Sequence, residues 1–256
     1  MNGYRQSGHG PIKVIVLSGW FGSSDDWTAL EPSLDLDRFT FVFFDYRGYG
    51  RSLKIEGRYD FSETAEDVLR LADHLQWRRF SLIGHSMGGM AMQRVMLADP
   101  GRIESMIAIT AVSAAGSGMP DERLALFRRA VDDPSTRESI LDASTGKRLT
   151  RQWVRHMSQQ SLANALPTAF GSYLSEWSRG NFSTQVKGCP IPLKVIVGEH
   201  DPSLSANAMQ QTWLAWYPNS ELEILSNAGH YPMHEAPPAL AASIQNFLQK
   251  TAGLAS

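Results

Sequence analysis

The chain has 256 residues, of which 43% are hydrophobic and 20% charged, and its formal net charge is -2. This length allows one α/β domain with a large core, and the composition is typical of an ordinary globular protein. Basic residues alternate with acidic ones in most segments, so no basic stripe is available to bind nucleic acid. The single cysteine, Cys189, cannot form an internal disulfide, and we assign no chemistry to it.

The N-terminal residues 1–10 are polar and lack the apolar stretch of a secretory signal. No apolar run approaches the length of about 18 residues that is needed to cross a bilayer. We therefore expect a cytoplasmic protein that has no membrane partner. The sequence gives no indication of the oligomeric state.

Short β-branched and aromatic runs alternate with stretches of helical periodicity along most of the chain. The predicted strands are residues 12–17, 39–44, 80–83, 103–110, 193–197 and 221–225. The predicted helices are residues 60–77, with Ser62 as N-cap, 87–97 and 238–249. This alternation predicts an α/β fold with a mainly parallel central sheet and helices on both faces.

Residues 114–186 interrupt this alternation. Three segments there have helical character, namely 124–131, 150–160 and 169–177, and none reads as a strand. The sequence thus predicts a core domain built from residues 1–113 and 187–256, with a helical cap formed by residues 114–186.

A serine lies at the junction of a predicted strand and a predicted helix, in Gly84-His85-Ser86-Met87-Gly88. This matches the G-x-S-x-G pattern of a nucleophile elbow, in which serine occupies a sharp and strained turn. Glycine at positions 84 and 88 suits such a turn, since side chains there would collide with adjacent elements. We therefore expect Ser86 to be a catalytic nucleophile.

A serine hydroxyl needs a base to accept its proton, and that base needs an orienting carboxylate. Of seven histidines, His230 directly follows the last predicted strand, where a loop at the carboxyl edge of the sheet would present it to Ser86. The preceding strand is followed by two acids, Glu199 and Asp201, and we favour Asp201 because it lies farther out on the loop. No metal or organic cofactor is implied.

Backbone amides are the expected donors to the oxyanion that forms when serine attacks a carbonyl. The amide of Met87 lies at the start of the helix that follows Ser86, and the glycine-rich segment 18–22 follows the first buried strand. We expect the amides of Trp20 and Met87 to form the oxyanion hole.

Taken together, these segments resemble the α/β-hydrolase superfamily, and specifically its group of small esterases, lactonases and carbon-carbon hydrolases. The resemblance extends over nearly the whole chain: the Gly19 loop, residues 45–52, the Ser86 elbow, residues 198–201, and Gly229-His230 followed by Glu235 and Pro237. It implies the α/β-hydrolase fold, and a structural role for Arg47 in anchoring loops. Relatives commonly carry histidine where this chain has Ser18, and the usual first strand is shortened to about residues 4–7.

The resemblance and the triad together predict a serine hydrolase that cleaves small uncharged esters or lactones through an acyl-enzyme. Alternatives on the same fold are carbon-carbon bond hydrolysis, perhydrolysis and cofactor-free oxygenation. A non-catalytic ligand receptor that has kept the triad is a further alternative. The serine argues against haloalkane dehalogenase and epoxide hydrolase activity, because those relatives use aspartate at the elbow.

Large apolar side chains near the catalytic loops and in the predicted cap are candidates for lining the substrate pocket. They are Phe21, Met119, Phe127, Trp153, Phe170 and Trp177. No cluster of arginine or lysine lies beside the elbow or the Asp201 and His230 loops in the sequence, so we expect uncharged substrates to be preferred over anionic ones.

Overall fold

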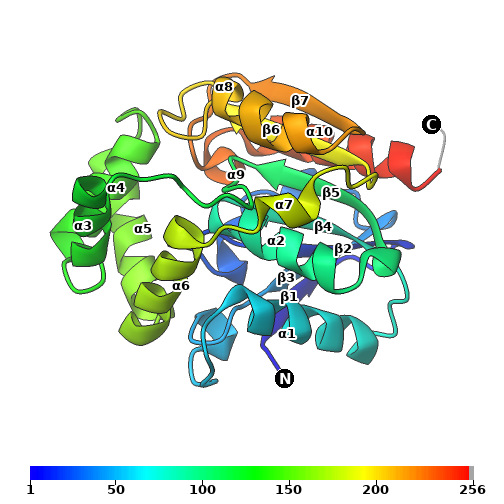
Figure 1. The fold of residues 1–256 in the computed structure, drawn as a ribbon, viewed down its shortest axis with the longest axis horizontal. Coiled ribbons are helices and arrows are strands. Elements are labelled where there is room, and N and C mark those ends of the chain that lie inside the picture. Colours follow the sequence, from blue (N-terminus) through cyan, green and yellow to red (C-terminus); the bar gives the residue numbers. More distant parts are fainter. Residues whose placement is uncertain (254–256) are drawn as a thin grey trace.

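The computed structural model describes residues 1–253, which are built around one seven-stranded sheet (Figure 1). The strand order is β1-β3-β2-β4-β5-β6-β7. Only β1 is antiparallel to its neighbour, and every other adjacent pair is parallel. The strands are β1 (Tyr4–Ser7), β2 (Ile12–Leu17), β3 (Phe39–Phe44), β4 (Phe80–His85), β5 (Ile103–Ile109), β6 (Leu193–Gly198) and β7 (Ser220–Leu225).

The central strands are covered on both faces. Every residue of β3, β4 and β6 is buried, although successive side chains of a strand point to opposite faces. Their continuous apolar runs fit this position in a parallel sheet. The predicted mainly parallel sheet with helices on both sides is therefore confirmed.

Helices α1 (Phe61–His74) and α2 (Met87–Ala98) pack against each other, and α2 covers the middle of the sheet (Figure 1). The predicted N-cap of α1 is wrong, because Asp60 takes that place and its carboxylate accepts a hydrogen bond from the Glu63 amide. Asp60 has the extended backbone that an N-cap needs, whereas Ser62 already lies in the first turn. After β7 come α9 (Pro232–Glu235) and α10 (Pro237–Thr251).

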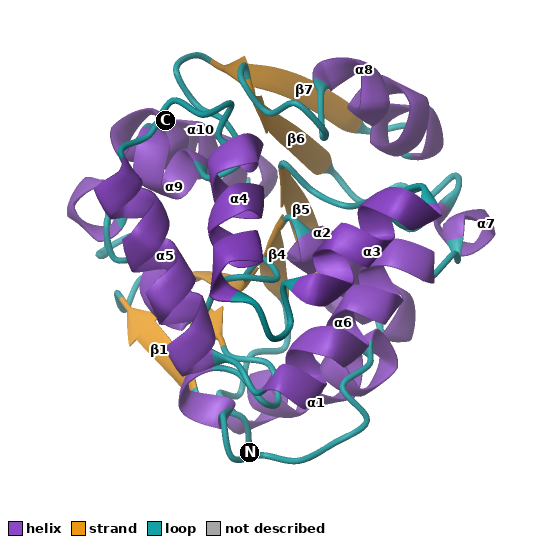
Figure 2. Ribbon diagram, turned by 90° about the vertical axis from the view of Figure 1, so that its left-hand side faces the viewer, coloured by secondary structure: helices purple, strands orange, loops and turns teal. Residues whose placement is uncertain are grey.

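Five helices lie between β5 and β6, and the first four of them gather at one end of the sheet, in front of the strands in Figure 2. They are α3 (Asp121–Arg129), α4 (Pro134–Ser144), α5 (Arg151–Asn164), α6 (Pro167–Arg179) and α7 (Ser183–Val186). Helices α3, α5 and α6 were expected from the sequence. The boundaries 114 and 186 of a separate cap domain stay a prediction.

Helix α4 has no counterpart among the predicted helices. Its apolar face is formed by Ile140 and Leu141, which is too little for a visible helical period. The helix starts instead from local signals, since Asp133 caps it and Pro134 occupies its first position. A short helix, α8 (Ala206–Met209), followed by a π-helical turn at Gln210–Leu214, was also not predicted.

Within residues 1–253, none of the helices combines the length and the apolar character needed to span a bilayer.

Candidate active site

Ser86 occupies a strained backbone conformation between β4 and α2. Its φ of 52° and ψ of -119° lie in a region that costs an L-residue on the order of 1–3 kcal/mol. Three backbone hydrogen bonds hold it there: Ser86 donates to the carbonyl of Ile109, and its own carbonyl accepts from the amides of Gly89 and Val112. The surrounding backbone therefore offsets the strain and holds Ser86 at the end of β4.

The two glycines of the elbow are required by contact distances. A β-carbon on Gly88 would lie 2.2 Å from the carbonyl oxygen of Leu17, and one on Gly84 would lie 2.5 Å from the carbonyl oxygen of Gly88. Backbone atoms cannot move aside as a flexible side chain can. The G-x-S-x-G spacing thus has a steric origin in this fold.

Ser86, His230 and Asp201 form a continuous chain of hydrogen bonds. The Oγ of Ser86 lies 2.9 Å from Nε2 of His230, and Nδ1 of His230 lies 2.6 Å from Oδ2 of Asp201. The Asp201 side chain is 1% exposed and that of His230 is 14% exposed. With Nδ1–H donating to the carboxylate, Nε2 of a neutral His230 faces the serine hydroxyl as an acceptor.

Asp201 is arranged to remain ionised beside His230. Its second oxygen accepts hydrogen bonds from the amides of Ser203 and Leu204, at 2.9 and 3.0 Å. Burial by itself would raise the pKa of the Asp201 carboxyl, but the His230 interaction and these amide bonds lower the pKa below its ordinary value. Glu199, the other acid considered, instead accepts from the amide of Asn227 at the surface.

Sequence reasoning missed the groups that hold the backbone of His230. The His230 carbonyl accepts hydrogen bonds from Nε2 of His85 at 2.7 Å and from the Thr110 hydroxyl at 3.0 Å. Burial lowers the pKa of His85 to about 3, so His85 is neutral at physiological pH, with its proton on Nε2. His85 lies within the elbow motif, but nothing in the sequence indicates that it donates to a residue 145 positions away.

The two amides expected to bind an oxyanion have no protein partner among residues 1–253. In the described part of the chain, neither the Trp20 nor the Met87 main-chain N–H donates to a protein acceptor. The loop that carries Trp20 lies directly against Ser86, since a β-carbon on Gly19 would be 3.1 Å from Cβ of Ser86. Met87 is the first residue of α2, where the helix dipole also favours negative charge.

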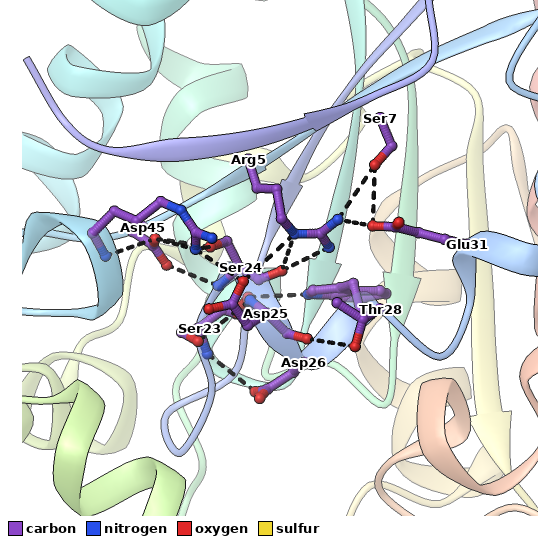
Figure 3. Close-up of polar contacts among 12 residues, drawn as sticks. Arg5, Ser7, Ser23, Ser24, Asp25, Asp26, Thr28, Glu31 and Asp45 are labelled. Carbon is purple, nitrogen blue, oxygen red and sulfur yellow. Dashed lines mark hydrogen bonds and ion pairs between the residues drawn. The ribbon is translucent and has the colours of Figure 1, made fainter.

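A polar network fixes the loop that follows β2. Ser18, at the position where the resemblance implied histidine, accepts a hydrogen bond from the Trp27 indole and donates to the carbonyl of Ser23. Farther along this loop, Ser24 donates hydrogen bonds from both its amide and its hydroxyl to the buried carboxylate of Asp45, which follows β3 (Figure 3). The loop therefore has side-chain support despite the departure at position 18.

Figure 3 also places Arg5 of β1 in this network, between Glu31 and the backbone of Ser24. The short first strand thus ties the turn Ser24–Trp27 to the edge of the sheet. Arg47 makes a comparable anchor elsewhere, with a two-pronged contact to Asp67 at 2.7 and 2.9 Å. This agrees with the structural role that the resemblance implied for Arg47.

Helix α6 holds the side chain of Trp20. The indole Nε1 donates to the carbonyl of Phe170 at 2.8 Å, and the two rings stack with centroids 3.9 Å apart. At the other end of the residue, the Trp20 carbonyl accepts from the Tyr49 hydroxyl at 3.1 Å. The candidate oxyanion loop is therefore bound on one side to Tyr49, in the segment after β3, and on the other to α6.

A cavity of about 920 Å³ opens onto Ser86 and His230. Four of the expected pocket residues line it: Phe21, Met119, Phe127 and Trp177. Further apolar walls come from Trp20, Val112, Leu126, Ile140 and Leu204. Ser86 and His230 thus face a largely apolar space between the sheet and the helices α3, α4 and α6.

The other two expected pocket residues are not brought to this cavity. Phe170 is fully buried under Trp20, and Trp153 packs against Tyr231 and His234, with ring centroids 5.4 and 5.8 Å away. Both apolar side chains instead pack α5 and α6 against the loops that carry Trp20 and Tyr231. That part of the expectation is corrected, because apolar character alone does not tell a pocket wall from a core.

The sequence has no cluster of arginine or lysine beside the Asp201 loop, but the fold brings cationic side chains to this loop from α3. Arg123 of α3 lines the cavity, and its guanidinium donates to the Ser203 hydroxyl at 2.7 Å. Arg129 and Glu122 line the cavity as well. These residues lie roughly 70 to 80 positions before the loop, so only the fold brings them near it.

The comparison with known proteins agrees with the geometry. Residues 13–237 match the family model described as the alpha/beta hydrolase fold. This chain belongs to the α/β-hydrolase family. The match spans β2 to the start of α10, and it includes the elbow and the loops that carry Asp201 and His230.

Individual relatives include esterases and lactonases. A pimeloyl-[acyl-carrier protein] methyl ester esterase from Citrobacter koseri is 24% identical over 258 residues, covering 96% of this chain and 98% of the esterase. A hydrolase from Oleispira antarctica has a TM-score of 0.86 at 20% identity, covering 97% and 94% of the two chains. The enol-lactonase of Burkholderia xenovorans has a TM-score of 0.82 at 21% identity, covering 96% of each chain. The chain is thus a hydrolase of this fold with esterase-like and lactonase-like neighbours.

Proposed function

We propose that the protein is a serine hydrolase that cleaves small uncharged carboxylic esters or lactones through an acyl-enzyme intermediate. The observation that carries the proposal is the hydrogen-bonded chain from Ser86 through His230 to Asp201 at the wall of the 920 Å³ cavity. The three groups have the order along the chain and the mutual geometry that nucleophilic acyl transfer requires.

In the proposed reaction, Oγ of Ser86 attacks the carbonyl carbon while Nε2 of His230 accepts the hydroxyl proton. The amides of Trp20 and Met87 stabilise the oxyanion, and His230 then protonates the leaving alkoxide. A water molecule, deprotonated by His230, attacks the acyl-enzyme; as the acid leaves, His230 returns this proton to Oγ of Ser86. Asp201 keeps the imidazole in the required tautomer and stabilises the imidazolium.

The substrate class rests on the walls of the cavity. Its lining is mainly apolar, and each buried methylene of a substrate gains roughly 0.8 kcal/mol. Short to medium acyl or aryl groups fit this space. Helices α3, α4 and α6 act in this proposal as a cap that covers the cavity and excludes water from it.

One observation favours a second candidate, carbon-carbon bond hydrolysis of anionic substrates. Arg123 lines the cavity beside the Asp201 loop and makes no ion pair within residues 1–253, so it is available to bind a carboxylate. Matched neutral and carboxylate-bearing esters separate the two candidates. A higher kcat/KM for the anionic series, lost in Arg123→Ala, would replace the proposal of uncharged substrates.

The serine mechanism is tested by labelling with a fluorophosphonate and mapping the adduct by mass spectrometry. We expect a single adduct on Ser86, none in Ser86→Ala, and turnover of an aryl acetate only by the wild type. An adduct on another residue would refute the nucleophile. Binding of small esters without any turnover would favour a ligand receptor.

A further inference from the structure

A buried carboxylate binds the backbone on both sides of the proposed catalytic histidine. Glu235 accepts hydrogen bonds from the amides on both sides of His230: Gly229 donates to Oε2 at 2.8 Å, and Tyr231 donates to Oε1 at 3.0 Å. The Glu235 side chain is 1% exposed. Hydrogen bonds to a charged group are stronger than neutral ones, so these two bonds hold the backbone of residues 229–231 in place.

The charge of Glu235 is balanced by an arginine from the segment between α4 and α5. Arg148 donates to Oε2 of Glu235 at 2.9 Å and, through its other terminal nitrogen, to the carbonyl of Asn227 at 3.1 Å. The cation is 30% exposed, whereas its partner carboxylate is buried. A buried carboxylate without its cation carries a large desolvation cost, so Arg148 stabilises Glu235 in its position between the two amides.

The end of α4 contacts the same loop. The His230 amide donates to the carbonyl of Ser144 at 3.2 Å, and a β-carbon on Gly229 would lie 2.9 Å from Cα of Thr145. The close approach explains glycine at position 229. The histidine loop is therefore bound to the helical segment by backbone contact as well as by the ion pair.

We propose that Arg148 is a positioning residue for His230: through Glu235 it holds the histidine loop, so that the segment between α4 and α5 forms part of the catalytic apparatus. This inference rests on the proposed serine mechanism. Proton transfer requires Nε2 to remain within hydrogen-bonding distance of the Ser86 hydroxyl. A misplacement on the order of 1 Å can lower a rate about 100-fold.

The test is the second-order rate at which a fluorophosphonate labels Ser86, because this rate depends on His230 and needs no knowledge of the natural ester. We expect Arg148→Met to lower the labelling rate at least tenfold, and Arg148→Lys to retain more of it because a cation stays near Glu235. With an aryl ester, kcat should fall by a similar factor while KM changes less than threefold.

A matched control is available at the other end of the sheet. Arg102 makes the same kinds of contact, to a carboxylate oxygen of Asp73 at 2.6 Å and to the carbonyl of Trp77 at 2.7 Å, although the Asp73 side chain is 69% exposed. Arg102→Met should lower the melting temperature but leave the labelling rate within twofold of the wild type.

The outcomes separate this inference from the proposed function. If Ser86 of the wild type is not labelled, the serine mechanism fails. If the wild type is labelled and Arg148→Met reacts at the wild-type rate, the positioning role is wrong and the mechanism stands. If Arg102→Met and Arg148→Met lose the same fraction of the labelling rate, a general loss of stability explains both and the positioning role is also wrong.

Discussion

Acid should destabilise this protein through His85, which lies next to the proposed nucleophile. His85 is 3% exposed, and burial lowers its pKa to about 3 from an ordinary value of 6.5. Between these two pH values the unfolded chain binds a proton that the folded protein does not. Stability should therefore be lost as the pH falls below 6.5.

The size of the effect follows from the pKa difference. Each pH unit below 6.5 costs about 1.4 kcal/mol of unfolding free energy for one such group, so the contribution of His85 at pH 4.5 is about 3 kcal/mol. His234, whose pKa is lowered by burial to about 4, adds a similar loss. Comparing variants at both pH values isolates the part that is due to His85.

The variant to measure is His85→Gln, whose amide can still donate to the His230 carbonyl but does not titrate. Urea unfolding followed by tryptophan fluorescence at pH 7.5 and 4.5 gives the two free energies. We expect the loss on acidification to be about 3 kcal/mol smaller in His85→Gln than in the wild type. His74→Gln, at an exposed position of α1, is the control and should keep the wild-type loss. An equal loss in His85→Gln and the wild type would refute the reasoning.

Three further outcomes are expected. Asp201→Asn should lower ester hydrolysis by roughly 10⁴ at neutral pH, because an amide favours the wrong imidazole tautomer, whereas Glu199→Gln should stay active; the reverse result would reassign the carboxylate. Gly88→Ala should yield little folded protein, because its methyl would lie 2.2 Å from a backbone oxygen, and a normal melting curve would contradict this. Trp20→Phe removes the indole hydrogen bond to the Phe170 carbonyl, which is worth about 1 kcal/mol. If this bond holds the loop in its reactive position, kcat should fall roughly fivefold. An unchanged kcat in steady-state assays would show that α6 does not position the loop.

Local patterns were sufficient to predict the sheet and the candidate catalytic residues. The lengths of the apolar runs in β3 and β6 predict the bounds of these strands, and their continuous apolar character predicts that both faces are buried. The strained turn at Ser86 requires glycine at positions 84 and 88. Asp201 and His230 were found because each follows a strand directly, and parallel strands end at one edge of the sheet. These features depend on neighbours in sequence or on a general property of parallel sheets.

Only the tertiary structure could decide which distant residues meet at the site. Arg123 lies beside Ser203, and Arg148 binds Glu235 across 87 positions, because the helices between β5 and β6 fold back over the sheet. Helix α4, which has little apolar periodicity, supplies the carbonyl that binds the His230 amide. The sequence by itself thus indicated which residues follow the strand ends, because those positions depend on local steric requirements. The packing of the helices decided which side chains line the pocket and which groups hold His230, because these depend on contacts between distant residues that no local pattern encodes.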